Sequence, residues 1–205
     1  MTTRAALEPV GRTRANQLAR LVTEVLAPAV LAALMPLVIA VHATGDWITG
    51  VGWGALAILF CSAIPYAIIW LGVRRGQLTD HHIGVREQRR RPMALAVVSV
   101  VGGLVVLRLL GAPRPLVAMV AVMLGVVLVV GIVNQGWKLS AHAAVATGSA
   151  TVLVIVFGAP LFVAFLLAVL VAWSRVELRD HTTAQVITGA LGGMLVAAPT
   201  YLLLA

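Results

Sequence analysis

The chain has 205 residues, of which 61% are hydrophobic and 11% are charged, and its formal net charge is +8. Soluble domains are roughly 45–50% apolar and about 25% charged, so the composition excludes an ordinary water-soluble globular domain. A basic excess can indicate nucleic-acid binding, but a chain that lies mostly inside a membrane has little surface with which to read a groove. The composition therefore predicts an all-α, polytopic integral membrane protein with no nucleic-acid partner.

Apolar runs of about bilayer-spanning length occur seven times. A transmembrane helix needs ~20 mostly apolar residues, and the fifth and sixth runs are short, so we expect these two to extend into polar loops or to cross a thin region. About 20 mostly polar to basic residues precede the first run and no clear cleavage site follows it, which favours a retained span over a signal peptide. The sequence thus predicts a bundle of six to seven spans, with residues 1–21 as a cytoplasmic N-terminal segment and residues 22–205 as a single membrane-embedded domain. The predicted spans are 22–42, 51–73, 93–111, 115–135, 142–158, 160–174 and 185–204.

Basic residues gather on one side of this predicted bundle. With the N-terminus in the cytoplasm, the inner segments hold 13 of the 15 Lys and Arg residues, the outer turns hold Arg114, and Arg108 lies inside a span. This asymmetry follows the positive-inside rule and predicts a multi-pass protein of the cell membrane with a cytoplasmic N-terminus. Segments 74–92, 135–142 and 174–184 then share the cytoplasmic side and contain four of the five His residues. We therefore expect any active site at the cytoplasmic face.

The segment that leads into the last span carries side chains suited to phosphate. His181 and Gln185 are four residues apart and would share one face of a helix. The Gln185 amide oxygen could then accept the Nδ1 hydrogen of His181 and leave Nε2 available for attack. Arg175 adds a planar guanidinium that matches the geometry of phosphate oxygens.

A second polar group lies at the start of the fifth predicted span, in the stretch WKLSAHAAVATG. Lys138, Ser140 and His142 come together there. A single His at the end of a span is often only a solvated residue. Two His residues together with Arg, Lys and Ser at one membrane face instead indicate a site that handles phosphate.

These residues resemble the three signatures of the type 2 phosphatidic acid phosphatase (PAP2) superfamily. Ser174-Arg175, with His181 and Gln185 at the spacing x5 and x3, resembles the third signature, SR-x5-H-x3-D. The stretch LSAH at 139–142 resembles the second, PSGH, and Arg91-Pro92 resembles the end of the first, K-x6-RP. The resemblance covers roughly residues 75–195.

The chain departs from the family pattern at three places. Gln185 stands where most members carry Asp, although the form H-T-x-x-Q-V is similar to the dolichyl-diphosphatase branch. Gly84 stands at the position of the first-signature lysine. Residues 93–135 insert a whole hairpin between the first and second signatures, and this hairpin is either scaffold or the lipid-facing wall of an opening.

The resemblance implies a metal-independent lipid phosphatase that needs no cofactor. His181 would attack phosphorus and form a phosphohistidine, His142 would protonate the leaving oxygen, and Gln185 would orient the nucleophile. The expected substrate is a phosphomonoester or diphosphate on a lipid of the bilayer, either an isoprenyl or polyprenyl diphosphate or a lipid like phosphatidic acid. The residues expected to hold phosphate are Arg175, Lys138, Ser140, Arg91 and Arg86, with Arg86 or Lys138 in place of the missing lysine.

The sequence also bears on a metal site, on a protein without catalytic activity and on a transporter. His81 and His82 are adjacent, which on a helix separates their directions by about 100°, and no second ligand cluster accompanies them, so we predict no metal. A catalytically silent relative whose basic loops bind anionic lipid is the main alternative, and Gly84 and Gln185 support it. A transporter would carry ionisable residues near the midplanes of several spans, which the sequence lacks. The sequence does not predict an oligomeric state.

Overall fold

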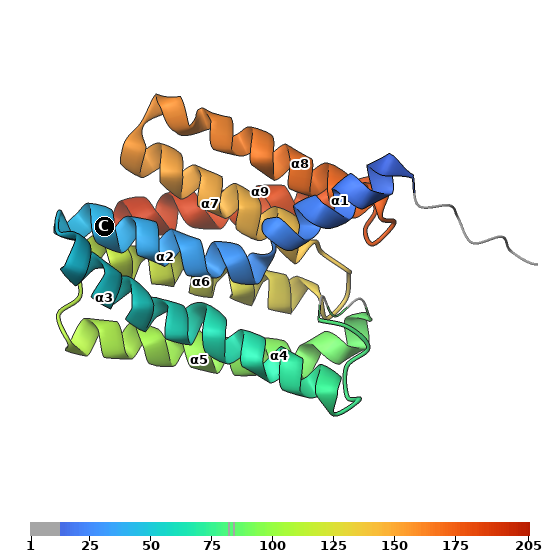
Figure 1. The fold of residues 1–205 in the computed structure, drawn as a ribbon, viewed down its shortest axis with the longest axis horizontal. Coiled ribbons are helices and arrows are strands. Elements are labelled where there is room, and N and C mark those ends of the chain that lie inside the picture. Colours follow the sequence, from blue (N-terminus) through green and yellow to red (C-terminus); the bar gives the residue numbers. More distant parts are fainter. Residues whose placement is uncertain (1–12, 82, 84) are drawn as a thin grey trace, which may run out of the picture.

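The computed structural model describes residues 13–81, 83 and 85–205, with the backbone alone for Arg86 and Glu87. This part of the chain forms helices and turns and contains no β-strand, which confirms the predicted all-α fold (Figure 1). The elements are α1 (Arg14–Val25), α2 (Pro28–Thr44), α3 (Trp47–Ile58), the π-helical turn η1 (Leu59–Ala63), α4 (Ile64–Arg74), the 3-10 turn η2 (Arg86–Arg89), α5 (Arg90–Leu109), α6 (Arg114–Val133), α7 (Ala141–Phe157), the 3-10 turn η3 (Ala159–Val163), α8 (Ala164–Glu177) and α9 (Thr183–Leu204).

All seven predicted apolar runs coincide with helices. Among the described residues, five helices are long and apolar enough to cross a membrane: the continuous helix α3–η1–α4, the helices α5 and α6, the helix η3–α8, and α9. Helices α1 and α2 reach this length only as a pair that is bent by 45°, and α7 is a shorter apolar helix of 17 residues. The chain is therefore a multi-pass membrane protein with five to six long candidate spans, and the sixth predicted run continues past residue 174 to Glu177.

Short turns connect the helices at one end of the bundle. Gly45 ends α2 in the left-handed conformation that suits glycine, and the Asp46 carboxylate then caps α3 by accepting a 2.7 Å hydrogen bond from the Thr49 amide. The turns before α6 and after α7 lie at the same end. The longer polar connections lie together at the opposite end (Figure 1). Their described residues are 75–81, 83, 85–89, 134–140 and 178–182. The structure thus confirms that the three polar segments share one end, as the parity of the spans predicts.

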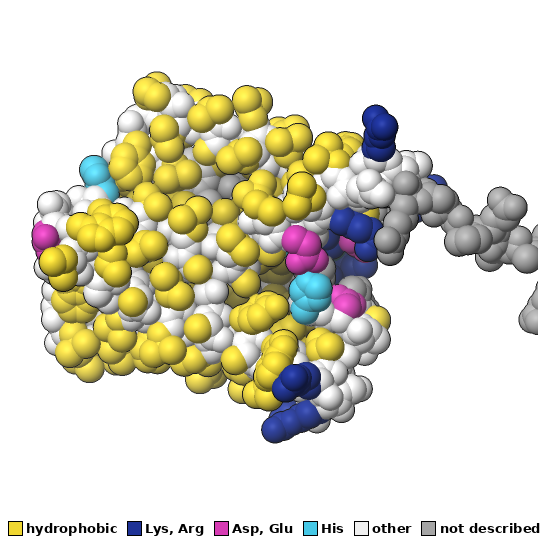
Figure 2. All heavy atoms as spheres, in the orientation of Figure 1, with side chains coloured by type: hydrophobic (Ala, Val, Ile, Leu, Met, Phe, Trp, Pro, Cys, Tyr) yellow, Lys and Arg dark blue, Asp and Glu magenta, His cyan; other side chains and the backbone are white. Residues whose placement is uncertain are grey.

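Helix α6 is the centre of the bundle. It contacts α2, α5, α7 and α9, and its buried side chains Met119, Val122, Val126 and Val130 belong to the hydrophobic core. The sequence allows two roles for the hairpin of α5 and α6, as scaffold or as the wall of an opening. In the structure this hairpin supplies core residues. The outer surface is also hydrophobic over most of the face seen in Figure 2. Apolar patches of this extent on a surface mark a membrane or an interface.

Helix α1 crosses the predicted boundary between residues 21 and 22. Thr13 caps it, accepting a 3.2 Å hydrogen bond from the Asn16 amide, and Pro28 begins α2 at a position where proline costs no hydrogen bond. The bend between the two helices lays α1 against α8. The last turn of α1 consequently reaches the polar end of the bundle.

Candidate active site

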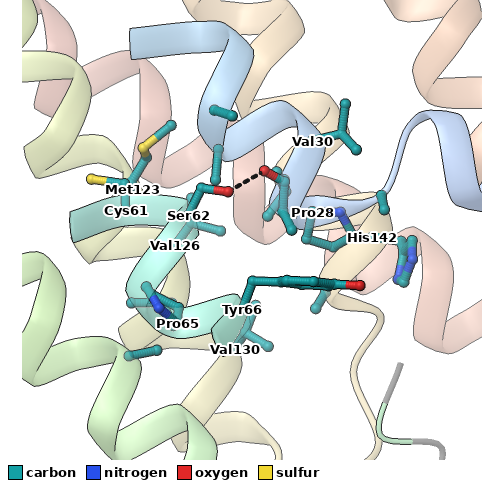
Figure 3. A pocket seen from close by; sticks show the side chains of 18 of the residues that line it. Pro28, Val30, Cys61, Ser62, Pro65, Tyr66, Met123, Val126, Val130 and His142 are labelled. Carbon is teal, nitrogen blue, oxygen red and sulfur yellow. Dashed lines mark hydrogen bonds between the residues drawn. The ribbon is translucent and has the colours of Figure 1, made fainter. Parts of the chain in front are cut away.

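A cavity of about 800 Å³ opens at the polar end of the bundle and continues between the helices. Its polar end is lined by charged and histidine side chains, and the rest of its wall is almost entirely apolar (Figure 3). The charged and histidine residues of the described wall are Glu24, His81, Arg89, His142, Arg175 and His181. The structure therefore brings together the two histidines and the arginine of the second and third signatures.

The turn between α8 and α9 explains the spacing of Arg175 and His181. Helix α8 ends in a Schellman turn, in which the Asp180 amide donates to the Arg175 carbonyl at 3.1 Å and the Arg179 amide donates to the Val176 carbonyl at 2.9 Å. The His181 amide also donates to the Arg175 carbonyl, at 3.2 Å. Arg179 has a φ of 56°, in the left-handed region, where a residue other than glycine costs about 1–2 kcal/mol. This turn folds His181 back over the end of α8.

Helix α9 begins with a capping box that also holds His181. The Thr182 hydroxyl accepts from the Gln185 amide at 3.3 Å, and Gln185 Oε1 accepts from the Thr182 amide at 3.1 Å. Gln185 Oε1 lies 3.3 Å from His181 Nδ1, and the carbonyl oxygen of Lys138 lies 3.2 Å from the same atom. The predicted contact of His181 with Gln185 is present, but His181 precedes the helix, so the contact comes from the capping turn and not from a shared helical face.

These contacts set the tautomer of His181. Both partners of Nδ1 are oxygen atoms that accept a hydrogen bond. The Thr182 backbone N–H also donates to the Gln185 side chain, which shows that the oxygen of that side-chain amide, and not its nitrogen, faces His181. Nδ1 therefore carries the hydrogen, and Nε2 keeps a lone pair. This is the arrangement that a nucleophilic imidazole requires.

The surroundings of His181 also keep its ring neutral. Burial, the largest cause, and the positive charges of Arg89, Lys138 and Arg175 together lower its pKa from 6.5 to about 4, against a smaller opposing effect of the hydrogen bond to the Lys138 carbonyl. Because the ring is uncharged, the electrostatic potential around it is set by the three nearby cations and is positive. Such a field favours an anion in the adjacent cavity.

Arg175 is buried and held on two sides. Its Nη2 forms a 2.9 Å ion pair with Asp180, and its Nη1 donates to the Thr23 hydroxyl of α1 at 3.3 Å. Thr23 in turn contacts the Ser174 hydroxyl at 3.0 Å. The Arg175 Nε is buried and has no hydrogen-bond partner among the described residues, which leaves one donor of a cavity-lining guanidinium unused.

Of the three successive arginines at positions 89–91, Arg89 is the one that lines the cavity. Arg89 is buried and lines the cavity, with Nε donating to the Ile83 carbonyl at 2.8 Å and Nη1 donating to Asn134 Oδ1 at 3.0 Å. Arg91 is exposed near the start of α5 and does not line the cavity. The turn from η2 into α5 directs Arg91, the third arginine of the run, outward, so the structure does not bring Arg91 together with the other predicted site residues.

The stretch at 138–142 is only partly at the cavity. His142, on the first turn of α7, is buried and lines the cavity. Ser140 is fully buried, caps α7 by accepting from the Ala143 amide at 3.4 Å, and does not line the cavity. Lys138 does not line it either, although its charge reaches His181; burial and the charge of Arg89 lower the pKa of Lys138. The structure thus gives Ser140 a capping role and places Lys138 beside the site.

Some positions of the sequence prediction lie outside the described residues. They are residues 1–12 of the predicted N-terminal segment, His82, Gly84 and the side chain of Arg86. Among the residues that are described, no group of three or more His, Cys, Asp and Glu side chains has the geometry of a metal site.

Glycines bring α9 against the helix that carries His142. A Cβ at Gly189 would lie 2.5 Å from the Ser140 carbonyl oxygen, and a Cβ at Gly193 would clash with the Ala144 carbonyl oxygen. The Thr147 hydroxyl donates across this contact to the Ala190 carbonyl at 2.8 Å. The close packing predicted for these glycines is confirmed, and it joins the His181 turn to α7.

Four residues of this region were not predicted from the sequence. They are Thr23, Glu24, Asn134 and Asp180. Asn134 ends α6 and orients Arg89, and Glu24 lies 3.2 Å from His81 at the mouth of the cavity. The available signals were an Asn at the end of an apolar run and a polar pair, Thr23 and Glu24, just before the bend at Pro28.

Comparison with known proteins gives no match. No protein-family model matches the chain, and neither a curated protein nor a solved structure does so.

Proposed function

We propose that the protein is a membrane-integral lipid phosphatase that hydrolyses a phosphomonoester or diphosphate through a phosphohistidine on His181. The observation that carries this proposal is the state of His181: buried, neutral, with Nδ1 bonded to oxygen acceptors and three cations around it. An imidazole in that state has a lone pair for attack on phosphorus in a field that attracts phosphate. The spaced motifs that resemble the PAP2 superfamily supply independent support.

The proposed reaction has two steps. His181 Nε2 attacks phosphorus, so an N–P bond forms while the bond from phosphorus to the leaving oxygen breaks, and His142 gives that oxygen a proton. His142 then takes a proton from water as the water oxygen attacks the phosphoryl group, the N–P bond breaks, and inorganic phosphate leaves. The Nδ1 hydrogen stays on His181 throughout, held by Gln185 and the Lys138 carbonyl.

Arg89 and Arg175 are the residues proposed to bind the phosphoryl oxygens. Both are buried, both line the cavity, and both are fixed by bonds to neighbouring residues. Donors held in advance where charge develops are typically worth about 2.7–4 kcal/mol each in the transition state. Lys138 adds positive charge from beside the cavity.

The site is proposed to face the cytoplasm. The support is the basic excess of the segments at the polar end of the bundle, since positive residues are retained on the cytoplasmic side. A substrate phosphate would sit there at the interface while its hydrocarbon part remained among the helices. Labelling of a cysteine placed at exposed Arg91 in a cysteine-free chain, in sealed cells and in opened cells, tests this orientation: we expect labelling only after opening.

A panel of lipid phosphates tests the proposed function. Purified protein in detergent is given farnesyl phosphate, farnesyl diphosphate, undecaprenyl diphosphate and phosphatidic acid, and inorganic phosphate is measured. We expect release from at least one of these lipids, with polyprenyl diphosphates ahead of phosphatidic acid. No release from any of them, together with binding of the protein to anionic vesicles, would support instead a catalytically silent protein that binds anionic lipid.

The protonation of His181 gives a separate prediction. Its lowered pKa means that the ring is neutral above pH of about 4 and gains a proton only as the pH falls through that value. NMR titration of the labelled histidines in the free protein should therefore show one ring with a midpoint near 4, well below the ordinary value of 6.5. The signal should be missing from a His181→Asn variant, and a midpoint near 6.5 for His181 would contradict the proposed electrostatics.

A further inference from the structure

The cavity extends far beyond the groups that would handle phosphate. Val130 and Met119 of α6 both line it, and eleven residues of helix at 1.5 Å each separate them by about 16 Å. This is about half of the ~30 Å hydrocarbon thickness of a bilayer. The apolar part therefore reaches from the polar end toward the middle of the bundle.

The walls of this apolar part come from five helical segments. Side chains of α2, of η1 with α4, of α5, of α6 and of α7 line it, including Val100 of α5 and Met119 of α6, which are 4% and 2% exposed. In Figure 3, Cys61, Ser62, Met123 and Val126 surround the deep part, and Tyr66 extends across the cavity from α4. Val100 and Met119 are the lining residues of α5 and α6 that lie farthest from the polar end of these helices, which places the deep end of the cavity beside them.

The same cavity opens sideways between α2 and α4. Val30 and Leu34 of α2 and Tyr66 of α4 all line it, yet 44%, 49% and 45% of these side chains remain exposed on the outer surface. Helix α2 packs along α3 and η1, whereas α4 packs on α5, so α2 and α4 diverge toward the polar end (Figure 1). Figure 2 shows a recess among hydrophobic side chains on this face, next to the charged end. Because this face is apolar, the opening leads to the hydrocarbon of the bilayer and not to water.

The π turn η1 shapes the wall opposite α2. Two residues of this turn make hydrogen bonds to neighbouring helices. The Ser62 hydroxyl donates to the Ala29 carbonyl of α2 at 2.7 Å, and the Phe60 carbonyl accepts from the Ser99 hydroxyl of α5 at 2.6 Å. π turns inside α-helices are frequent at functional sites. Here the turn fixes α2 and α5 to the same helix on either side of the opening.

We infer that the cavity encloses one hydrocarbon chain of the substrate, which enters from the bilayer between α2 and α4, and that the substrate class is a single-chain lipid phosphate. A volume of about 800 Å³ lies within the ~300–1,000 Å³ of pockets that enclose most of a ligand of ordinary drug size. A farnesyl chain or one alkyl chain with its phosphate matches that size, whereas the two chains of a membrane glycerolipid together exceed it. A longer polyprenyl chain would fit with its far part outside the opening, in the bilayer. This inference rests on the proposed function for the chemistry at the polar end.

The deep end of the cavity predicts a limit on chain length that a substitution can move. Val100→Phe fills the deep part of the cavity, and Val98→Phe is the matched control, because Val98 is on the same helix, 68% exposed, and does not line the cavity. Phosphate release is measured for saturated alkyl phosphates and for isoprenyl phosphates of increasing length, and for a two-chain phosphatidic acid. We expect Val100→Phe to lower kcat/KM for the longest chains by about tenfold or more and to spare the shortest chains, while Val98→Phe keeps the wild-type profile. We also expect single-chain lipids to exceed phosphatidic acid in the wild type.

A measurement of binding separates this inference from the proposed function. A hexadecyl phosphonate, which cannot be hydrolysed, carries a photoreactive diazirine at the end of its chain and is crosslinked to the wild-type protein. Adducts at the deep cavity, on α6 near Met119 or on α5 near Val100, are expected, and they would support an enclosed chain even if no lipid phosphate were hydrolysed. Adducts confined to outward-facing positions such as Val98, or a chain-length profile in Val100→Phe equal to that of the wild type, would overturn the inference while leaving phosphate release by the protein untouched.

Discussion

His181→Asn is expected to lower kcat/KM for phosphate release by about 10³-fold or more, as removal of a nucleophile does in other hydrolases. Asparagine can still donate from its amide to Gln185 and the Lys138 carbonyl, as Nδ1 does. It has no atom that takes the part of Nε2. The variant therefore removes the attacking lone pair with little change in the turn, and phosphate release from a preferred lipid phosphate measures the loss.

His42→Asn is the matched control for this variant. His42 lies at the opposite end of the bundle, where its ring packs 4.7 Å from the ring of Phe157. We expect the kcat/KM of the His42→Asn variant to stay within a few-fold of the wild-type value. A His181→Asn protein that remains folded and keeps more than a tenth of the wild-type activity would rule out His181 as the nucleophile.

Arg89→Gln is expected to lower kcat/KM by about 10²-fold to 10³-fold, the loss typical of one preorganised donor to a developing oxyanion. Arg91→Gln, two residues away in the same run, is expected to change it by about twofold or less, because Arg91 is exposed and outside the cavity. The pair decides which arginine serves the site. A larger loss in Arg91→Gln than in Arg89→Gln would contradict the structural assignment.

A second readout separates electrostatics at Arg89 from its structural contacts. The positive charge of Arg89 lowers the pKa of His181, so Arg89→Gln should raise the midpoint of the His181 titration. Arg89→Lys keeps the charge but loses the paired contacts with Ile83 and Asn134, and it should leave that midpoint low. If Arg89 acted only through its structural contacts, both substitutions would shift the midpoint of the His181 titration in the same way.

The fold was predictable because the length of an apolar run is a direct signal for a membrane helix. The number of apolar runs that precede a polar segment decides at which end of the bundle that segment lies. Counting the runs therefore predicted that His142, Arg175 and His181 lie at the same end. The contribution of α1 was not predictable in this way. Thr23 and Glu24 precede the bend at Pro28, and hydropathy alone does not show that the bend lays α1 against α8.

The arginine run shows the limit of motif spacing. Successive residues on a helix point about 100° apart, so the choice among Arg89, Arg90 and Arg91 depends on where the turn η2 becomes α5. Gln185 was predictable because a four-residue spacing is short enough for either a helix or a capping turn to bring it to His181. The cavity could not be predicted from the sequence, because the Ala, Val and Met residues that line it are common in any membrane helix.

Direct detection of the phosphoryl-enzyme tests the central claim. Purified protein is mixed with a lipid phosphate carrying radioactive phosphorus, stopped within milliseconds in alkali, which preserves phosphohistidine, and digested for mass spectrometry. We expect label on the peptide that contains His181, label that is lost in acid, and no label in His181→Asn. Rapid phosphate release with no labelled His181 at any time, or label on another residue, would contradict the proposed mechanism.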